Sequence, residues 1–425
     1  MLRKLIFFIP AFVLILCACS KQGAMPGYQK SFTISLDNTL QAERTDEAIN
    51  ISIASIKEKY PDFNPDAFAV FEKDNEIASQ ATDINADGIP DYITFVRNFN
   101  SLEKVYVSIN YNISGKTGHN YKKRTQAEVS VKVDYELVGA KYTKGRFQNV
   151  DKVKLPSNHE DHNAYLRYEG PGWESEKVGY RLYLDARTRT DIWGKKVNEL
   201  VLHTVGVNDL VAEDESYQSM MSWGMDIFKV GKSLGIGSIT MPTEKGLEIV
   251  ADTDSVICYI SSNGDVRSDV LTKYFGWQTA KGKYDFNTLH TIAAGSRLCE
   301  FNADINPGVD ELATGLAKHE NTAYFRSQDA NSEWQYIALY GKQTLAGPGD
   351  ELGISLIYNN NDKLEITEDD LSYIVKLKPT DGKLKYYFAA AWIQEPDGIK
   401  NIDEFRTYLN AELARLNKPV TVIIN

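Results

Sequence analysis

The stretch SFTISL, residues 31–36, alternates apolar and polar side chains and sets the pattern for much of the chain. Because side chains of an extended strand point alternately to its two sides, Phe32, Ile34 and Leu36 share one face. The same period of two returns in AINISIAS (48–55), DAFAVFE (66–72), DYITFVRNF (91–99), KVYVSINYN (104–112) and AEVSVKVDYEL (127–137). Short strands separated by turn residues are typical of a β-sandwich, so we expect an all-β fold.

Residues 31–112 predict an N-terminal β-sandwich, and the polar stretch 113–124, ISGKTGHNYKKR, is the best boundary. The rest, 125–425, is also rich in strand patterns and predicts a larger β-domain with a few short helices.

Two stretches predict helices. Residues 214–231, DESYQSMMSWGMDIFKVG, hold a compact block of Met and aromatic side chains. Near the C-terminus, Asn401 followed three residues later by Glu404 resembles a capping box. Apolar residues then recur at helical spacing, at positions 402, 405, 409, 413 and 416, before Asn417 and Pro419 end the pattern. This second stretch predicts an amphipathic helix packed on a sheet.

The N-terminus predicts export. Arg3 and Lys4 precede an apolar run, 5–16, that is too short to span a membrane, and LCAC follows at 16–19. This pattern predicts a signal peptide over 1–18, with Cys19 as the lipid-bearing residue of a lipoprotein. The alternative is an ordinary signal peptide with a stray cysteine. Residues 19–30 are predicted to form a tether between the lipid anchor and the folded part of the chain. We expect the protein to be attached to the outer membrane and to face either the periplasm or the cell surface.

Composition narrows the possible partners. The chain of 425 residues has 47 basic and 58 acidic residues, a net charge of −11. Because nucleic-acid binding needs clustered Lys and Arg, we expect no nucleic-acid partner. We also expect the lipid anchor to be the chain's contact with the membrane. After removal of the signal peptide, Cys258 and Cys299 remain besides Cys19. They would either form a disulfide or lie buried as free thiols.

The stretch DINADGIPD, 83–91, resembles short calcium loops. Calcium prefers six to eight oxygen ligands, which alternate Asp or Asn residues supply around a Gly turn. The candidate ligands are Asp83, Asn85, Asp87 and Asp91. The alternative is a metal-free turn rich in Asx side chains. Since the stretch joins two strand patterns, we expect it to lie far from any cleft and calcium to be structural.

The densest polar and aromatic stretch is 158–196. His159 and His162 lie three residues apart, which suggests a metal site only weakly because no third ligand follows from the spacing. In GYRLYLDAR, 179–187, period two puts Arg181, Tyr183, Asp185 and Arg187 on one face. Such a face suits either a groove for an acidic ligand or an exposed ladder of ion pairs, because guanidinium groups match carboxylates in geometry.

Three blocks together resemble a secreted bacterial family, the domain of unknown function 4861. They are residues 168–196, residues 219–238, and the closing pair 386–395 and 402–416. The resemblance implies a galactose-mutarotase-like supersandwich. It also implies a role on uronic-acid-containing, pectin-type glycans. The family has no known catalytic residues to transfer.

Two kinds of function follow as hypotheses. In an enzyme, a lyase would use Arg181 or Arg187 to neutralise a uronate carboxylate and His159, His162 or Tyr183 as the base. A hydrolase would instead use two carboxylates such as Glu174 and Asp185. In either enzyme Trp173 and Tyr180 would contact the sugar. The alternative is a lipoprotein that binds glycans without catalysis.

Overall fold

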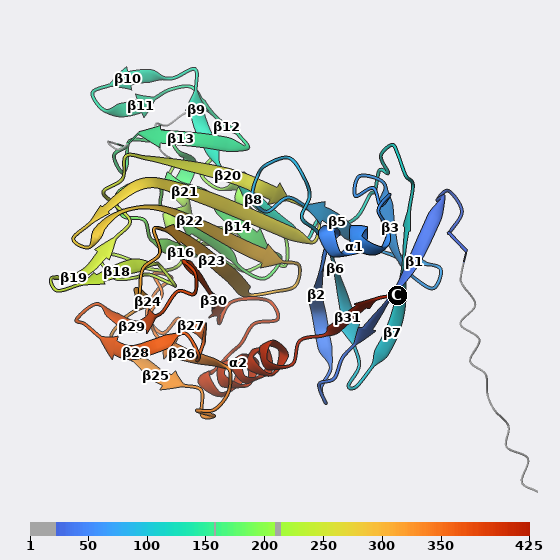
Figure 1. Cartoon of the computed structure of the whole chain (residues 1–425). Coiled ribbons are helices and arrows are strands. Elements are labelled where there is room, and N and C mark those ends of the chain that lie inside the picture. The colour runs from blue at the N-terminus through green and yellow to red at the C-terminus, as the bar shows by residue number, and fades with distance from the viewer. Residues whose placement is uncertain (1–22, 157–158, 209–213) are drawn as a thin grey trace, which may run out of the picture.

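The computed structural model describes residues 23–156, 159–208 and 214–425. Within these ranges the protein is all-β, as predicted, and its α-helices are α1 (Ile53–Lys59) and α2 (Ile402–Asn417). Figure 1 shows a smaller N-terminal unit beside a larger one. Across the described ranges, no helix is long and apolar enough to cross a membrane. The predicted signal peptide and Cys19 lie outside the described residues.

The N-terminal unit is a β-sandwich of two antiparallel sheets. The first has the order β31 (Thr421–Ile424), β1 (Lys30–Asp37), β7 (Lys104–Tyr111), β3 (Phe68–Glu72) and β4 (Asn75–Ile77). The second has the order β2 (Arg44–Ser52), β6 (Tyr92–Phe99) and β5 (Ser79–Thr82). The apolar face predicted for residues 31–36 is confirmed, since Phe32, Ile34 and Leu36 are buried between the sheets.

The end of the chain completes this first sandwich. Strand β31 pairs antiparallel with β1, with Ile34 opposite Ile424. The pairing brings the C-terminus across to the N-terminal unit, as the dark red strand in Figure 1 shows. The domain boundaries expected from the sequence, 31–112 and 125–425, assigned β31 to the larger unit and not to the N-terminal sandwich. Strand β31 is short and its pattern gives no sign of its partner.

The larger unit contains three main antiparallel sheets. The nine-stranded sheet has the order β13 (Lys152–Pro156), β20 (Ser255–Asn263), β21 (Arg267–Thr279), β22 (Gly282–Ala293), β23 (Leu298–Asn306), β30 (Lys383–Trp392), β27 (Leu352–Asn359), β26 (Trp334–Gly341) and β25 (Thr322–Arg326). One five-stranded sheet has the order β17 (Gly224–Asp226), β16 (Thr190–Lys195), β15 (Gly179–Leu182), β14 (Gly172–Ser175) and β8 (Thr125–Glu128). The other has the order β19 (Gly246–Ile249), β18 (Thr240–Thr243), β24 (Leu312–Ala317), β29 (Ser372–Leu377) and β28 (Lys363–Glu368).

The remaining elements are short. Two-stranded ribbons pair β10 (Glu136–Val138) with β11 (Lys141–Thr143), and β9 (Ser130–Val133) with β12 (Arg146–Asn149). The single-turn 3-10 helices are η1 (Arg167–Glu169), η2 (Leu202–Thr204) and η3 (Ser216–Gln218). The predicted order of a smaller sandwich before a larger one is confirmed. The likeness to galactose mutarotases stays a prediction.

The main core lies between the nine-stranded sheet and the two five-stranded sheets. Tyr180 of β15 packs edge-on against Phe388 of β30, with ring centroids 5.1 Å apart. Phe286 and Phe301 point into this core from the nine-stranded sheet. Their chain neighbours Asn287 and Asn302 are on the other face of that sheet, because strand side chains alternate. The outer face of the nine-stranded sheet is therefore polar at Asn287 and Asn302.

Helix α2 confirms the amphipathic helix predicted near the C-terminus. The side chain of Asn401 accepts hydrogen bonds from the backbone N–H groups of Asp403 and Glu404 and so caps the first turn. Phe405, Leu409 and Leu413 are buried, and the helix contacts β26 and β27. The predicted period therefore identified both the helix and the face that packs on the sheet.

The prediction of a helix over residues 214–231 is wrong. From residue 214 onward, the structure has the single turn η3 and then β17, which pairs with β16. Gly224 has φ of 139° and Gly231 has φ of 56°, backbone conformations that end a helix. Tyr217 and Trp223 instead pack against Trp193 of β16, whereas Met220 and Met221 are exposed.

The two cysteines of the larger unit are free thiols. Cys258 in β20 and Cys299 in β23 are both buried and unpaired. Burial raises the pKa of the Cys258 thiol to about 12 and that of Cys299 well above its usual value. Of the two alternatives for Cys258 and Cys299, the structure therefore shows buried free thiols.

Candidate functional site

Two of the predicted sugar-binding residues lie in the core. Trp173 and Tyr180 have no exposed surface. The Tyr180 hydroxyl donates to the carbonyl of Arg297 and accepts from the backbone N–H of Ala390. A sugar ring cannot reach either side chain, so their predicted role in substrate binding is wrong.

Glu174 is also fully buried. Its carboxylate accepts from Lys195 at 2.7 Å and from the backbone N–H groups of Val201 and Leu202. Burial raises the pKa of Glu174 while Lys195 opposes the rise. The hydrolase pair of Glu174 and Asp185 therefore has no counterpart in the structure, because one of its carboxylates never meets solvent.

Arg181 and Tyr183 belong to a buried polar network behind the site. Arg181 donates to Asp191 at 2.5 Å, to Asp226 at 2.6 Å and to the Tyr183 hydroxyl at 2.8 Å. Burial works against the charge of Arg181, but Tyr183, Asp226 and Asp191 keep its pKa well above the usual value. Arg181 is therefore too deeply buried to bind a substrate carboxylate.

We expect Asp226→Asn to change how stability depends on pH. Burial and the neighbouring Asp191 raise the pKa of Asp226 to about 7, against Arg181, from an unfolded-state value of 3.8. The carboxyl group thus binds its proton more tightly in the folded protein, and its ionisation lowers stability as pH rises from about 4 to about 7. Asparagine stays neutral, so the variant should gain stability relative to the wild type over that range. Urea unfolding at a series of pH values measures this difference, and a constant difference would contradict it.

A cluster of polar side chains does form where the sequence predicted chemistry. Glu169 stands at its centre, with His162 Nδ1 3.2 Å from its Oε1 atom. Arg187 Nη2 donates to the same Oε1 at 2.6 Å and to Asp185 at 2.5 Å. We call His162, Glu169, Asp185 and Arg187 the Glu169 cluster. One carboxylate oxygen therefore holds an imidazole and a guanidinium together.

The turn after β15 creates this arrangement. Strand β15 ends at Leu182, so Asp185 and Arg187 do not continue the predicted alternating face. Instead, an Asp185 carboxylate oxygen accepts from the backbone N–H of Arg187 and from its Nε. The Tyr183 ring lies 4.2 Å from the guanidinium carbon of Arg187, which adds a cation–π contact. Arg187 is held rigidly yet keeps 29% of its side chain exposed.

The backbone around the cluster is strained. Tyr168 and Glu169 have φ of 40° and 70°, His162 has 49° and Thr188 has 40°. Non-glycine residues rarely adopt this left-handed region, and such residues gather at functional sites. In the cluster, the strained turn at Glu169 is what points its carboxylate at His162 and Arg187.

A hollow of about 520 Å³ opens beside the cluster. His159, Asp185 and Arg187 line it together with Glu160, Asp161, Arg189 and Lys232. Burial lowers the pKa of His159, so its imidazole is neutral near pH 7. Asn163 Nδ2 lies 3.3 Å from His159 Nδ1, while the Asn163 oxygen accepts from the backbone of Tyr165. The neutral ring of His159 therefore carries its proton on Nε2.

Sequence reasoning missed Glu169 and Asn163. Glu169 stands in no periodic strand pattern, and its orientation depends on the left-handed turn. The sequence that follows, Gly170-Pro171-Gly172, is typical of a turn but does not determine the backbone conformation of Glu169. Among the predicted residues, the structure brings together His159, His162, Asp185 and Arg187. Tyr183 and Arg181 border this group from the buried side, and Trp173, Glu174 and Tyr180 lie in the interior.

The calcium-like loop joins β5 to β6 and is held by its own side chains. Asp83 accepts from the backbone N–H groups of Asn85, Ala86 and Gly88, and Asp91 accepts from that of Ile84. Within the described ranges, no three His, Cys, Asp or Glu side chains are grouped to hold a metal. This applies to His159 and His162 as well. Calcium at Asp83, Asn85, Asp87 and Asp91 stays a prediction.

We expect calcium to raise the melting temperature and a chelator to lower it, because a ligand of the folded state alone stabilises that state. Asp87→Ala removes one candidate ligand and a single backbone hydrogen bond, to Ile89, and should abolish the response. Asp74→Ala, at an exposed position in the β3–β4 turn, is the control. A melting temperature unaffected by chelator in the wild type would identify a metal-free turn.

Comparison with known proteins gives one strong match. The family model "Domain of unknown function (DUF4861)" matches residues 36–422. No curated protein matches the chain. A solved glycosyl hydrolase family 38 protein from Enterococcus faecalis is 11% identical with a TM-score of 0.45, and the match covers 93% of this chain and 47% of that one. An α-mannosidase from Enterococcus faecalis V583 has the same identity and TM-score, with 93% and 46% covered. This chain spans about half the length of these two proteins. Because the family match covers most of the sequence, the chain belongs to the DUF4861 family.

Proposed function

We propose that the protein is a lyase that acts on uronic-acid-containing oligosaccharides at the Glu169 cluster. The observation that carries this proposal is the shared oxygen of Glu169, which contacts both His162 and Arg187. β-Elimination needs a cation for the uronate carboxylate and a base for the proton on the adjacent carbon. The cluster provides both groups side by side.

Each residue has a defined role in this reaction. Arg187 binds the uronate carboxylate and stabilises the charge that develops there when the adjacent C–H bond breaks. Glu169 faces Nδ1 of His162 and so directs the lone pair to Nε2, the atom that takes the C5 proton. Glu169 is thus a positioning residue.

The electrons of the broken C5–H bond form the C4–C5 double bond, and the C4–O4 bond breaks. The leaving oxygen receives a proton from water in the hollow, and His162 later returns its proton to solvent. A neutral His159 is too weak an acid for this step, and we give it the role of binding a sugar hydroxyl through Nε2–H.

The proposal also includes attachment to the outer membrane through lipid on Cys19, facing the periplasm or the cell surface. It is supported by the N-terminal pattern of residues 1–19. Mass spectrometry of the mature protein tests it. A lipid-modified Cys19 at the N-terminus is expected, and an unmodified cleaved chain would contradict it.

A panel of uronic-acid oligosaccharides tests the reaction. A lyase produces a new ultraviolet absorbance from the unsaturated product together with new reducing ends. New reducing ends without that absorbance would show a hydrolase and contradict the proposed chemistry. Binding without turnover would establish the alternative, a glycan-binding lipoprotein.

A further inference from the structure

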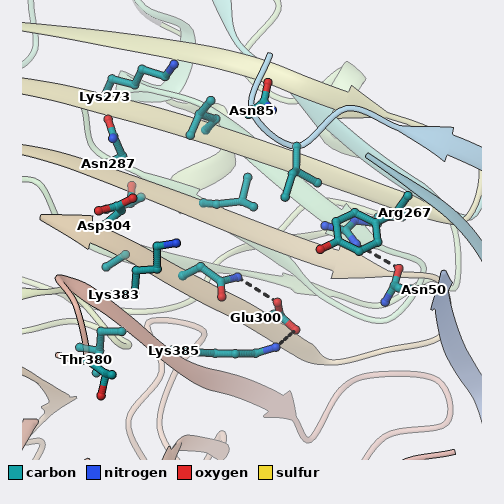
Figure 2. Close-up of a pocket in the computed structure, with 18 of the residues that line it drawn as sticks. Asn50, Asn85, Arg267, Lys273, Asn287, Glu300, Asp304, Thr380, Lys383 and Lys385 are labelled. Atoms are coloured by element: carbon teal, nitrogen blue, oxygen red, sulfur yellow. Dashed lines mark hydrogen bonds and ion pairs between the residues drawn. The ribbon is translucent and has the colours of Figure 1, made fainter. Parts of the chain in front are cut away.

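A second hollow lies between the N-terminal sandwich and the nine-stranded sheet. It is a groove of about 720 Å³, lined by β21, β22, β23 and β30 of the sheet and by residues of β2, β6 and the 83–91 loop. Figure 2 shows its floor, with the sheet strands side by side and Asn50 and Asn85 at one end. The lining combines polar side chains with apolar ones, among them Leu271 and Leu289.

Strand pairing arranges these side chains in rows. Lys273 of β21 pairs with Asn287 of β22, Asn287 pairs with Asp304 of β23, and Asp304 pairs with Lys383 of β30. Figure 2 shows the row running from Lys273 to Lys383. Neighbouring strands lie about 4.8 Å apart, so the row is about 14 Å long. That length suits a short oligosaccharide better than a single sugar.

The next row provides an apolar strip. Leu271 of β21 pairs with Leu289 of β22, and Leu289 pairs with Asn302 of β23. Both leucines line the groove. The C–H face of a sugar ring packs on such a surface while its hydroxyl groups reach amide and carboxylate groups in the row beside it.

The first row ends in Lys273 and Lys383, and the ammonium group of Lys273 lies 5.3 Å from the centroid of the Tyr259 ring. Within the described ranges, neither Lys273 nor Lys383 makes an ion pair. By contrast, Lys385 pairs with Glu300 at 2.9 Å and Arg267 pairs with Asp269 at 2.9 Å. The lining also holds Asp362 and Asp304, the latter opposite Lys383, so its four basic side chains (Arg267, Lys273, Lys383 and Lys385) outnumber its three acidic ones (Glu300, Asp304 and Asp362) by one, and this excess favours an anionic ligand.

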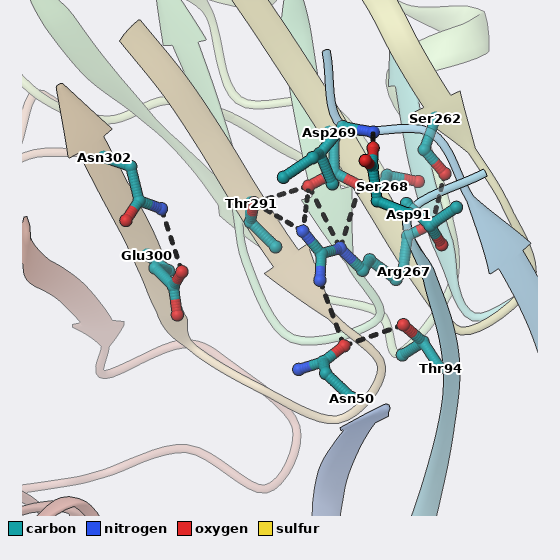
Figure 3. A network of polar contacts seen from close by, with 12 residues as sticks. Asn50, Asp91, Thr94, Ser262, Arg267, Ser268, Asp269, Thr291, Glu300 and Asn302 are labelled. Atoms are coloured by element: carbon teal, nitrogen blue, oxygen red, sulfur yellow. Dashed lines mark hydrogen bonds and ion pairs between the residues drawn. The ribbon is translucent and has the colours of Figure 1, made fainter. Parts of the chain in front are cut away.

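The N-terminal sandwich forms a fixed wall of the groove. Arg267 Nη1 donates to Asn50 Oδ1 at 3.0 Å, and Asn50 also accepts from Thr94 at 2.7 Å, as Figure 3 shows. Gln80 of β5 accepts from the backbone N–H groups of Val266 and Arg267. These contacts fasten the wall that carries Ile84 and Asn85. The expectation that the 83–91 loop lies far from any cleft is therefore wrong.

The groove and the Glu169 cluster are on opposite faces of the larger sandwich. Asn287 and Asn302 are on the outer face of the nine-stranded sheet, while their neighbours Phe286 and Phe301 point into the core. Arg181, behind the Glu169 cluster, is on the outer face of the five-stranded sheet, and its neighbour Tyr180 points into the same core. One short ligand cannot occupy both places.

We infer that the groove is a second binding site, for a short oligosaccharide that carries carboxylate groups. The two lysines bind carboxylates at its ends, Asn287 and Asp304 bind hydroxyl groups between them, and the leucines contact the ring. Such a site keeps a polysaccharide chain at the protein independently of the reaction at the Glu169 cluster. The inference holds whether or not that cluster is catalytic.

Titration calorimetry with the full chain tests the site, using tetragalacturonate and its carboxyl-reduced form as probes. His162→Ala is the parent protein, so that no probe is converted. We expect the parent to bind the acidic probe more tightly than the reduced one. The double variant Lys273→Ala/Lys383→Ala should lose about tenfold or more in affinity for this site, because two charge-assisted contacts disappear.

Controls separate charge from folding. The pair Lys273→Arg/Lys383→Arg keeps both charges and should keep binding. Lys154→Ala removes an exposed lysine from β13 of the same sheet, outside the groove, and should have no effect. Unchanged affinity in the double alanine variant, equal binding of the reduced probe, or no binding by the parent would each overturn the inference. A lyase assay of the wild type reports separately on the proposed function.

Discussion

Replacing His162 with alanine should lower the rate of unsaturated-product formation by about 10²- to 10⁴-fold, the usual contribution of a positioned general base. His162 is the only imidazole among the described residues that shares a carboxylate oxygen with an arginine. Half of its side chain is exposed, so the substitution leaves no buried cavity and the protein should fold normally. Initial rates from ultraviolet absorbance on a uronate oligosaccharide measure the effect.

Two controls separate a base from a structural residue. His203→Ala alters another exposed histidine, in η2, and should keep the wild-type rate. Imidazole added to the His162→Ala protein should restore part of the rate, because a small base can enter the space that the side chain leaves. A His162→Ala protein that matches the wild type would remove the cluster from the reaction. Lost activity without rescue, combined with a lowered melting temperature, would point to structure alone.

The fold was predictable where local patterns decide it. Period two identified β1 and β7, and the cap at Asn401 with its helical spacing identified α2, because burial of one face determines each element. The 214–231 stretch failed for the same reason. Its apolar residues are divided between buried positions, such as Met225 and Phe228, and the exposed Met220 and Met221, and the positive φ values at Gly224 and Gly231 interrupt any helix. The partner of β31 depends on a contact with a strand almost 400 residues earlier, which no local pattern encodes.

The candidate site was predictable only in its location. The polar stretch 158–196 did contain the cluster, yet Trp173, Glu174, Tyr180, Arg181 and Tyr183 are buried. Alternation assigns a face to Arg181 correctly, but it cannot show that residues around η2 and η3 cover that face. The strained turn at Glu169 is equally invisible, because its φ follows from packing and not from residue type. The groove escaped notice because β21, β22 and β23 form it only together with β30 and with residues 50, 84, 85 and 92 of the N-terminal sandwich, which are far from them in sequence.

The buried pair of Lys195 and Glu174 should dominate the stability of the five-stranded sheet. Both side chains are completely buried, and Lys195 also donates to the carbonyl of Ser175. Lys195→Met keeps most of the volume but leaves the Glu174 carboxylate in the core without its cation. Removing one partner of a buried ion pair costs about 3–5 kcal/mol, so we expect a loss of that size in urea unfolding.

The pH dependence of the Lys195→Met variant identifies the cause. Without Lys195, burial alone acts on the pKa of Glu174, which burial already raises in the wild type. A folded-state pKa above the unfolded value means that ionisation destabilises the fold, so the loss should grow as pH rises and shrink in mild acid. Lys144→Met breaks an exposed pair with Glu136 and, as the matched control, should change stability by under about 1 kcal/mol at every pH. A loss for Lys195→Met that is equally small, or independent of pH, would mean that water reaches Glu174 and that this face of the sheet is less closed than its packing implies.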